Sequence, residues 1–421
     1  MINKLKSKSE FSRNVLTLMT GTTIAQAIPI AISPILTRIY TPEDFGVFAL
    51  FIAIASIFGS IVNGRYELAI MLPKKDEDAI NIFALGFIIT ITLSIFLLSL
   101  VVIFHNYFIT ILNNKEIGNW LYFMPIAVLF MGLFNLLNYF NNRKKYYKDI
   151  ANAIIIKSII LATVQLSMGL LKQGLAGLIS GQILSQIFAN MRLFKNIIQD
   201  KRLISKISKV KIIALAKKYK KFPIYNTQHA LINIVFSRMP IFILSKFFDA
   251  STIGFYSLSI RIVQTPITII GNAFANVLYQ KIVHKRNNGQ KYINQIFKFL
   301  KTQIMLAVLL FIVIFILSNY IGIIFGESWS EVGLYIKLLM PWLFMVFIVS
   351  PLAFSINMTN NQEKGLYLEW IYGGIKLASL LVGALYFKNV EKTLILFSVA
   401  NSLFLLYQAN WFINLLKEEE L

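Results

Sequence analysis

The sequence contains no cysteine and only three histidines, His105, His229 and His284. The missing cysteines exclude disulfides, thiolate metal sites and cysteine nucleophiles, and the three histidines lack the spacing of metal ligands. No GxxxxGK[ST] phosphate-binding loop occurs, which excludes ATP hydrolysis by that route. We therefore expect no metal, no cofactor and no catalytic residue.

Charged residues are scarce as well, at 14% of the 421 residues, whereas 57% are hydrophobic and the mean hydropathy is +0.67. Soluble proteins carry about 25% charged residues. Apolar runs of about 18 or more residues recur along the whole chain, and each is long enough to cross a bilayer as a helix. The composition predicts an all-α polytopic membrane protein.

Acidic residues are the rarer kind, with 19 Asp and Glu against 41 Lys and Arg and a net charge of +22. In a soluble protein this balance would suggest nucleic acid, but here the basic residues gather in alternate loops. One set of loops holds about 28 of them and the opposite set about six. By the positive-inside rule both chain ends lie in the cytoplasm, and nucleic acid is not an expected partner.

Hydropathy predicts about twelve transmembrane helices in two lobes of six. We expect an N-terminal lobe over residues 1–195, a basic cytoplasmic linker over 196–221 and a C-terminal lobe over 222–421. The predicted spans are 14–38, 45–70, 80–104, 119–139, 150–171, 174–195, 222–245, 252–280, 299–318, 332–356, 365–387 and 392–416.

The two predicted lobes share a sequence echo. TRIYTPEDFGVFAL (37–50) is matched by SKFFDASTIGFYSL (245–258), at an offset of 208 residues. With six spans in each half, both copies run in the same direction through the membrane. The echo therefore predicts a parallel internal repeat about an axis along the membrane normal.

The opening of the chain resembles a known family. SRNVLTLMTGTTIAQAIPIAISPILTRIYTPEDFGVFAL (12–50) is similar to the first helix, outer turn and second-helix start of bacterial polysaccharide-biosynthesis membrane proteins. GRYELAIMLPKK (64–75) resembles the segment that closes their second helix. These proteins are oligosaccharide-lipid flippases of the multidrug/oligosaccharidyl-lipid/polysaccharide (MOP) exporter superfamily.

The resemblance implies helices 1, 2, 7 and 8 around a central cavity that is cationic in this chain. It implies a multi-pass protein of the bacterial cytoplasmic (inner) membrane that acts in O-antigen, lipopolysaccharide or capsule biosynthesis. The implied substrate is an undecaprenyl-diphosphate-linked oligosaccharide, which moves from the inner to the outer leaflet by alternating access. Membrane lipids and other polysaccharide assembly proteins are the implied partners.

Three arginines lie inside predicted spans, where a charge costs roughly 2.5–3.5 kcal/mol on insertion scales. Arg65 is placed about 13 Å along a helix from the cytoplasmic boundary, and Arg238 and Arg261 about 12 Å deep on the outer side. We expect all three to bind the diphosphate through their planar, permanently charged guanidinium groups. The alternative is structural ion pairing or snorkelling to the interface.

Three further charged residues inside predicted spans are candidates. Glu67 follows Arg65 by two residues on the same predicted helix, so the two are not expected to pair. It is a candidate to bind a coupling H⁺ or Na⁺, or to balance an arginine of another helix. Lys157 and Lys376 occupy comparable places in the two halves and are substrate-binding candidates, or else lie on peripheral helices.

Prolines mark candidate gates. Pro29 and Pro34 fall inside the first span and Pro240 inside the seventh, and interrupted helices in corresponding halves of transporters accompany binding sites and gates. Proline is also common in ordinary membrane helices. The polar residues Asn63, Gln26 and Asn272 are interpreted either as contacts to sugar hydroxyls or as links between helices.

Two other functions compete with the flippase. A multidrug cation antiporter of the same superfamily would need an acidic cavity. A membrane-embedded polysaccharide polymerase or ligase would need a sizeable outer loop, yet those near 105–118 and 319–331 have about 14 residues each. The basic linker is explained by topology, with an amphipathic helix on anionic lipid as an alternative.

Overall fold

The computed structural model describes the backbone of residues 2–420 and the side chains of 17–271, 274–275 and 277–420. Every regular element within residues 2–420 is a helix. The chain forms two compact units, Met1–Arg238 and Met239–Leu421, whose boundary falls inside helix α11 (Thr227–Phe247). The predicted all-α fold of about twelve long helices in two lobes is confirmed, while the predicted lobe limits stay a prediction.

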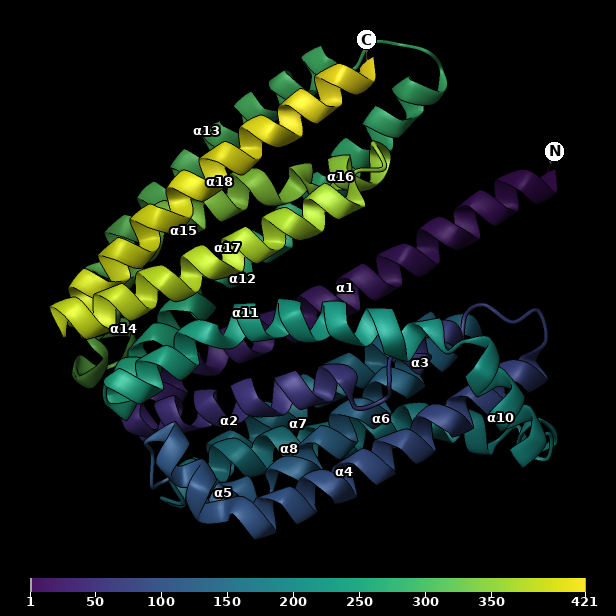
Figure 1. The fold of residues 1–421 in the computed structure, drawn as a ribbon, viewed down its shortest axis with the longest axis horizontal. Coiled ribbons are helices and arrows are strands. Elements are labelled where there is room, and N and C mark those ends of the chain that lie inside the picture. The colour runs from purple at the N-terminus through teal and green to yellow at the C-terminus, as the bar shows by residue number, and fades with distance from the viewer. Residues whose placement is uncertain (1, 421) are drawn as a thin grey trace. The chain divides into compact units, whose positions relative to one another are not determined.

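The described part of the first unit contains six long helices (Figure 1). They are α1 (Ile2–Ile39), α2 (Pro42–Ile61), α4 (Asp76–Leu112), α6 (Met124–Arg143), α7 (Tyr147–Leu170) and α8 (Leu175–Ile198). Short elements connect them: α3 (Tyr66–Ala69), α5 (Gly118–Leu121), α9 (Lys201–Ile204), α10 (Lys209–Lys218) and the π-helical turn η1 (Phe222–Asn226) that enters α11.

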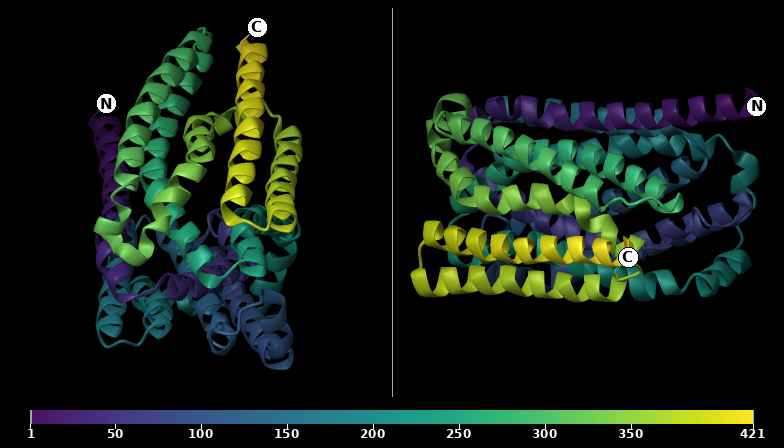
Figure 2. Two further views of the ribbon diagram at one scale, coloured as in Figure 1. Left: turned by 90° about the vertical axis from the view of Figure 1, so that its left-hand side faces the viewer. Right: turned by 90° about the horizontal axis from the view of Figure 1, so that it is seen from above.

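The second unit takes up the last part of α11 and five more long helices. They are α12 (Ala250–Asn287), α13 (Ile293–Ser318), α15 (Glu331–Val349), α17 (Gln362–Val382) and α18 (Val390–Glu420). Its short elements are α14 (Ile321–Phe325), η2 (Glu327–Trp329), η3 (Ser350–Ala353), α16 (Phe354–Met358) and η4 (Gly383–Phe387). The last two long helices, α17 and α18, run side by side (Figure 2).

Corresponding helices pack together in the two units. In the first, α6 packs on α2, α4 and α8, and α7 packs on α8. In the second, α15 packs on α12, α13 and α18, and α17 packs on α18. Counted in chain order, these are the same four pairs, which is what an internal repeat requires.

The second helix of each unit also begins in the same way. Thr41 caps α2: its hydroxyl accepts a hydrogen bond from the Asp44 N–H (3.2 Å), and the Asp44 carboxylate accepts one from the Thr41 N–H (3.2 Å). Asp249 caps α12 by accepting a hydrogen bond from the Thr252 N–H at 3.1 Å. Both residues supply the acceptor that a helix start lacks. They lie at the offset of the predicted repeat.

Eleven helices of the described residues are long and apolar enough to cross a membrane. The predicted sixth span, α8, forms a helix of 24 residues but falls outside those eleven. Its hydropathy is lowered by polar residues that the fold buries, among them Ser185, Gln186 and Asn190. The chain is a multi-pass membrane protein.

Candidate functional site

A tight turn after α2 positions Arg65. The helix ends at Ile61, and Gly64 (φ +58°) and Arg65 (φ 59°) both adopt the left-handed backbone conformation. Glycine reaches this region without steric cost, whereas arginine holds it only where the surroundings impose it. The prediction of an unbroken helix over 45–70 is therefore wrong, because the chain turns at 62–65 and resumes as the short α3.

Asn63 fastens this turn to two other helices. Its Nδ2 donates hydrogen bonds to Thr90 Oγ1 of α4 (2.8 Å) and to the main-chain oxygen of Gly132 in α6 (3.0 Å). A Cβ atom at Gly132 would lie only 2.4 Å from Val62 Cγ1, so glycine permits this close approach. Of the two interpretations of Asn63, the geometry favours the link between helices.

Arg65 and Glu67 form an ion pair, with Nη1 of Arg65 at 3.3 Å from Oε1 of Glu67. The expectation that they would not pair is wrong, because it assumed one regular helix, whereas the left-handed turn brings both to the same side. The Glu67 side chain is 2% exposed and that of Arg65 is 24% exposed. Arg65 Nε and Glu67 Oε2 are buried without a hydrogen-bond partner among the described residues.

Arg238 reaches α2 from α11. Its Nε donates a hydrogen bond to Oγ of Ser56 at 3.1 Å, and Nη1 of Arg65 donates to the main-chain oxygen of Ser60 at 3.2 Å. Positions 56 and 60 are one helical turn apart on the same side of α2, about 6 Å along its axis. We call Arg65 and Arg238 the α2 arginine pair. Two guanidinium groups thus attach to neighbouring points of one helix.

Arg261 lies half-buried in α12 of the second unit. Its main-chain oxygen accepts a hydrogen bond from the Thr265 hydroxyl at 2.7 Å. Of the three predicted arginines, the structure brings two onto one helix of the first unit, and the role of Arg261 stays a prediction. The side chain of Asn272, further along α12, lies outside the described residues.

Both candidate lysines lie over aromatic rings. The Nζ of Lys157 is 5.1 Å from the ring centre of Phe134. The Nζ of Lys376 is 3.9 Å from the ring centre of Tyr372 and 6.0 Å from that of Trp342, whose indole N–H donates to the Tyr372 hydroxyl at 2.8 Å. Cation–π contacts of this kind stabilise a buried ammonium. They are compatible with a structural role as well as with substrate binding.

The candidate gating prolines lie inside helices that continue through them. α1 contains Pro29 and Pro34, and α11 contains Pro240. Pro29 has no N–H for the main-chain oxygen of Ala25, four residues earlier. That oxygen instead accepts a hydrogen bond from the Ser158 hydroxyl of α7 at 2.8 Å. The hydrogen bond from Ser158 therefore links α1 to α7 at the oxygen that Pro29 leaves without a donor, while gating stays a prediction.

Sequence reasoning did not single out the serines that organise this site. Ser56, Ser60 and Ser158 resemble ordinary polar residues of membrane helices, and only the folded chain shows what they contact. No group of three His, Cys, Asp or Glu residues that could hold a metal ion occurs among the described side chains.

Comparisons with known proteins agree with this architecture. The fold is similar to a multidrug resistance MATE family transporter of the MOP superfamily in an inward-facing conformation, with a TM-score of 0.72 and 14% identity over 95% of this chain and 96% of that one. It is also similar to the lipid II flippase MurJ in an inward closed conformation, with a TM-score of 0.71 and 15% identity over 96% of this chain and 90% of that one.

A third structure, an outward-facing MATE family transporter of the MOP superfamily, has a TM-score of 0.62 and 12% identity over 96% of both chains. Among curated proteins, none matches this chain. The family model described as "polysaccharide biosynthesis protein" matches residues 35–333, from the end of α1 into α15. The chain belongs to the polysaccharide biosynthesis protein family and has the fold of the MOP exporter superfamily.

Proposed function

We propose that this protein is a flippase that moves undecaprenyl-diphosphate-linked oligosaccharide from the inner to the outer leaflet of the bacterial cytoplasmic membrane. The observation that carries this proposal is the α2 arginine pair, two guanidinium groups at neighbouring points of one membrane helix. The family description and the fold shared with a lipid II flippase support a lipid-linked glycan as the substrate class.

The pair suits a diphosphate for a physical reason. An unpaired phosphate anion cannot enter hydrocarbon without prohibitive cost, so it needs fixed positive charge along its route. Guanidinium binds phosphate oxygens through two parallel N–H donors. In Arg65, Nε is a buried donor without a partner among the described residues, which a phosphate oxygen would satisfy. Arg261 of the second lobe would take over the diphosphate as the lobes rock.

Glu67 is the counter-ion of Arg65 in the α2 arginine pair. Its carboxylate neutralises Arg65 when no substrate is bound, at 3.3 Å. Binding of a diphosphate to Arg65 would displace this carboxylate, which would then need a cation of its own. We propose H⁺ or Na⁺ for that role, which would couple transport to an ion gradient.

The proposed setting follows from charge and family. The basic loops support termini in the cytoplasm of a bacterial cell. The family description supports a role in polysaccharide biosynthesis, for which we propose a glycan of O-antigen or capsule type. Other polysaccharide assembly proteins, which would extend or attach the translocated glycan, are the proposed partners.

A multidrug cation antiporter is the second candidate, favoured by the likeness to a multidrug resistance transporter. A cationic drug would require free carboxylates, yet the buried Glu67 is engaged by Arg65. A polymerase or ligase fits less well. Only residues 113–117 separate α4 from α5, which leaves little outer loop for catalytic groups.

The test is transbilayer movement of a short-chain polyprenyl-diphosphate oligosaccharide in proteoliposomes. Arg65→Ala, Arg238→Ala and Arg261→Ala should each slow it about 10- to 100-fold, the loss expected when a hydrogen bond to a charged group is removed. Imposed H⁺ and Na⁺ gradients should change the wild-type rate.

Arg286→Ala is the matched control, because Arg286 pairs with Glu419 at the exposed end of α12. It should transport like wild type. If the three alanine variants fold and also transport like wild type, the arginine site is wrong. If wild type moves none of this lipid under any gradient, the flippase proposal fails and cationic drugs become the next substrates to try.

A further inference from the structure

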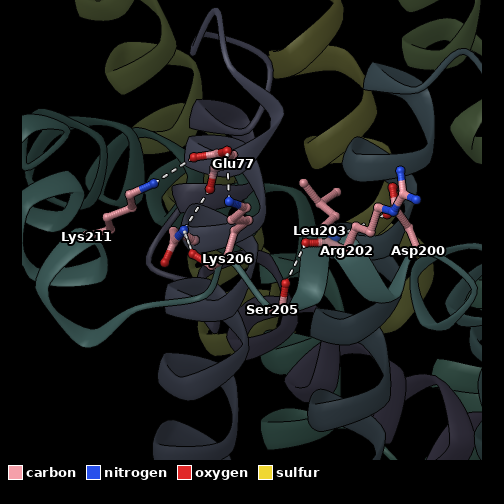
Figure 3. A network of polar contacts seen from close by, with 8 residues as sticks. Glu77, Asp200, Arg202, Leu203, Ser205, Lys206 and Lys211 are labelled. Atoms are coloured by element: carbon pink, nitrogen blue, oxygen red, sulfur yellow. Dashed lines mark hydrogen bonds and ion pairs between the residues drawn. The ribbon is translucent and has the colours of Figure 1, made fainter.

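The segment between α8 and η1, within the first unit, is held against α4 by a cluster of polar contacts. The ammonium groups of Lys206 and Lys211 converge on the Glu77 carboxylate of α4, at 3.8 Å and 2.9 Å (Figure 3). Asn81, one turn further along α4, donates to the main-chain oxygen of Lys206 (3.0 Å) and accepts from the Ser208 N–H (2.8 Å). The hydrogen bond to Glu77 raises the pKa of Lys211.

Apolar contacts fix which side of α10 faces inward. Leu215 of α10 and Leu203 of α9 are buried in a core cluster of the first unit. The Tyr66 hydroxyl of α3 donates a hydrogen bond to the main-chain oxygen of Ala216 at 3.1 Å. With both polar and apolar contacts on one side, α10 has a defined outward face.

That outward face is both apolar and basic. Val210 is 76% exposed and Ile213 is 47% exposed, and the helix period of 3.6 residues places them together. Lys209, Lys217 and Lys218 are exposed beside them. A cytoplasmic helix that faced only water would carry polar residues at positions 210 and 213.

The charge of the segment is one-sided. Residues 195–221 contain ten Lys and Arg residues and a single acidic residue, Asp200. Glu77 pairs with Lys206 and Lys211, and every basic side chain of the segment except Lys211 is exposed. α10 packs along the first turns of α4, where that membrane helix begins at Asp76. By the positive-inside rule this end of α4 is expected at the cytoplasmic membrane surface, and the basic face with it.

We propose that the outward face of α10, formed by Val210 and Ile213 with Lys209, Lys217 and Lys218, binds anionic phospholipid headgroups of the cytoplasmic leaflet. Apolar residues flanked by lysines are the pattern of helices that lie in the interface plane. Each lysine near an anionic surface adds attraction that falls off within a Debye length, so salt should weaken the contact. The segment that joins the lobes is then held by the first unit on one side and by lipid on the other.

The absence of cysteine in the chain makes a site-specific test simple. Val210→Cys in the full-length protein is labelled with an environment-sensitive nitrobenzoxadiazole probe and placed in nanodiscs of phosphatidylcholine alone or mixed with phosphatidylglycerol. In the mixed discs the emission should shift to shorter wavelength, and lipids with a quencher near the headgroup should remove most of it. Added salt should reverse both the emission shift and the quenching. So should a triple variant that carries Lys209→Gln, Lys217→Gln and Lys218→Gln.

Gln290→Cys, in the exposed loop between α12 and α13, is the control position and should remain in water in both kinds of disc. If the probe at 210 behaves like the control in both, the lipid proposal is overturned and the face is left for a protein partner or a second copy of the chain. Equal quenching in both kinds of disc would overturn the anionic part. Ile213→Cys on the same face replaces Val210→Cys if that variant fails to fold.

Discussion

The second helices of the two units begin alike and continue differently. α2 and α12 start from side-chain caps at Thr41 and Asp249, 208 residues apart. α2 stops at Ile61 and turns through Gly64 and Arg65, both with positive φ. The corresponding backbone in α12, at 272 and 273, stays helical within a helix that runs to Asn287. The two copies of the repeat therefore differ at the point where the first unit holds the Arg65–Glu67 ion pair.

The two units share helix packing but differ in the turn that follows α2. Four pairs of long helices pack alike in the two units. Within the described backbone of residues 2–420, the left-handed turn follows α2 and has no counterpart in α12. It places a guanidinium group at the end of α2, beside the carbonyl groups that a helix leaves without partners there. Local departures of this kind are typical of functional sites.

The largest effect on stability should come from Glu67. Removing it leaves Arg65 as an uncompensated charge, which costs about 3–5 kcal/mol in a fully buried pair. Because Arg65 is 24% exposed, we expect about 2 kcal/mol for Glu67→Ala. The double variant Arg65→Ala, Glu67→Ala should be less destabilised than Glu67→Ala alone.

The Tm in detergent checks this prediction. Glu391→Ala, at the exposed start of α18, is the control and should leave the Tm nearly unchanged. A Glu67→Ala protein as stable as this control would mean that the ion pair does not hold the turn.

Alanine substitutions at Gly64, in the turn after α2, and at Gly271, in the continuous helix α12, should have opposite effects on stability. Gly64→Ala forces a side chain into the left-handed region and should cost about 1–2 kcal/mol. Gly271→Ala in α12 should stabilise by up to about 1 kcal/mol, because a Cβ there finds only ordinary contacts, the nearest at 3.9 Å to Phe347. The Tm of the two variants should move in opposite directions, and a shift of the same sign would break the contrast.

A smaller effect concerns α1. Ser158→Ala removes the donor to the Ala25 oxygen and should cost about 1 kcal/mol. In a Pro29→Ala background the restored N–H can take that oxygen, so the same serine change should cost clearly less. The four proteins of this double-mutant cycle are compared by Tm. Equal costs in both backgrounds would show that the proline and the serine are not coupled.

Much of the fold could be predicted from the sequence, because long apolar runs and alternating basic loops are direct consequences of a bilayer. The break at 62–65 could not be predicted from hydropathy, which continues through it. The Asn63–Gly64 dipeptide is a common turn signal and was the available clue. The Arg65–Glu67 pair follows from that turn, so it was missed for the same reason.

Other features of the site depend on tertiary structure. Nothing local in the sequence associates Arg238 with Ser56, 182 residues earlier, or Lys376 with the ring of Trp342. These contacts form only in the folded chain, where Arg238 of α11 reaches Ser56 of α2 and Lys376 of α17 reaches Trp342 of α15. The sequence could identify charges that need partners, but it could not identify the partners.

The most direct test of the central claim is the affinity of the detergent-solubilised protein for a polyprenyl diphosphate, measured as a double-mutant cycle over Arg65→Ala and Arg238→Ala. If the α2 arginine pair binds one diphosphate, each single change should weaken binding about 10- to 100-fold, and the double change should cost less than the product of the two. If the two effects multiply independently, or if neither exceeds that of Arg286→Ala, the two arginines do not share a ligand and the account is contradicted.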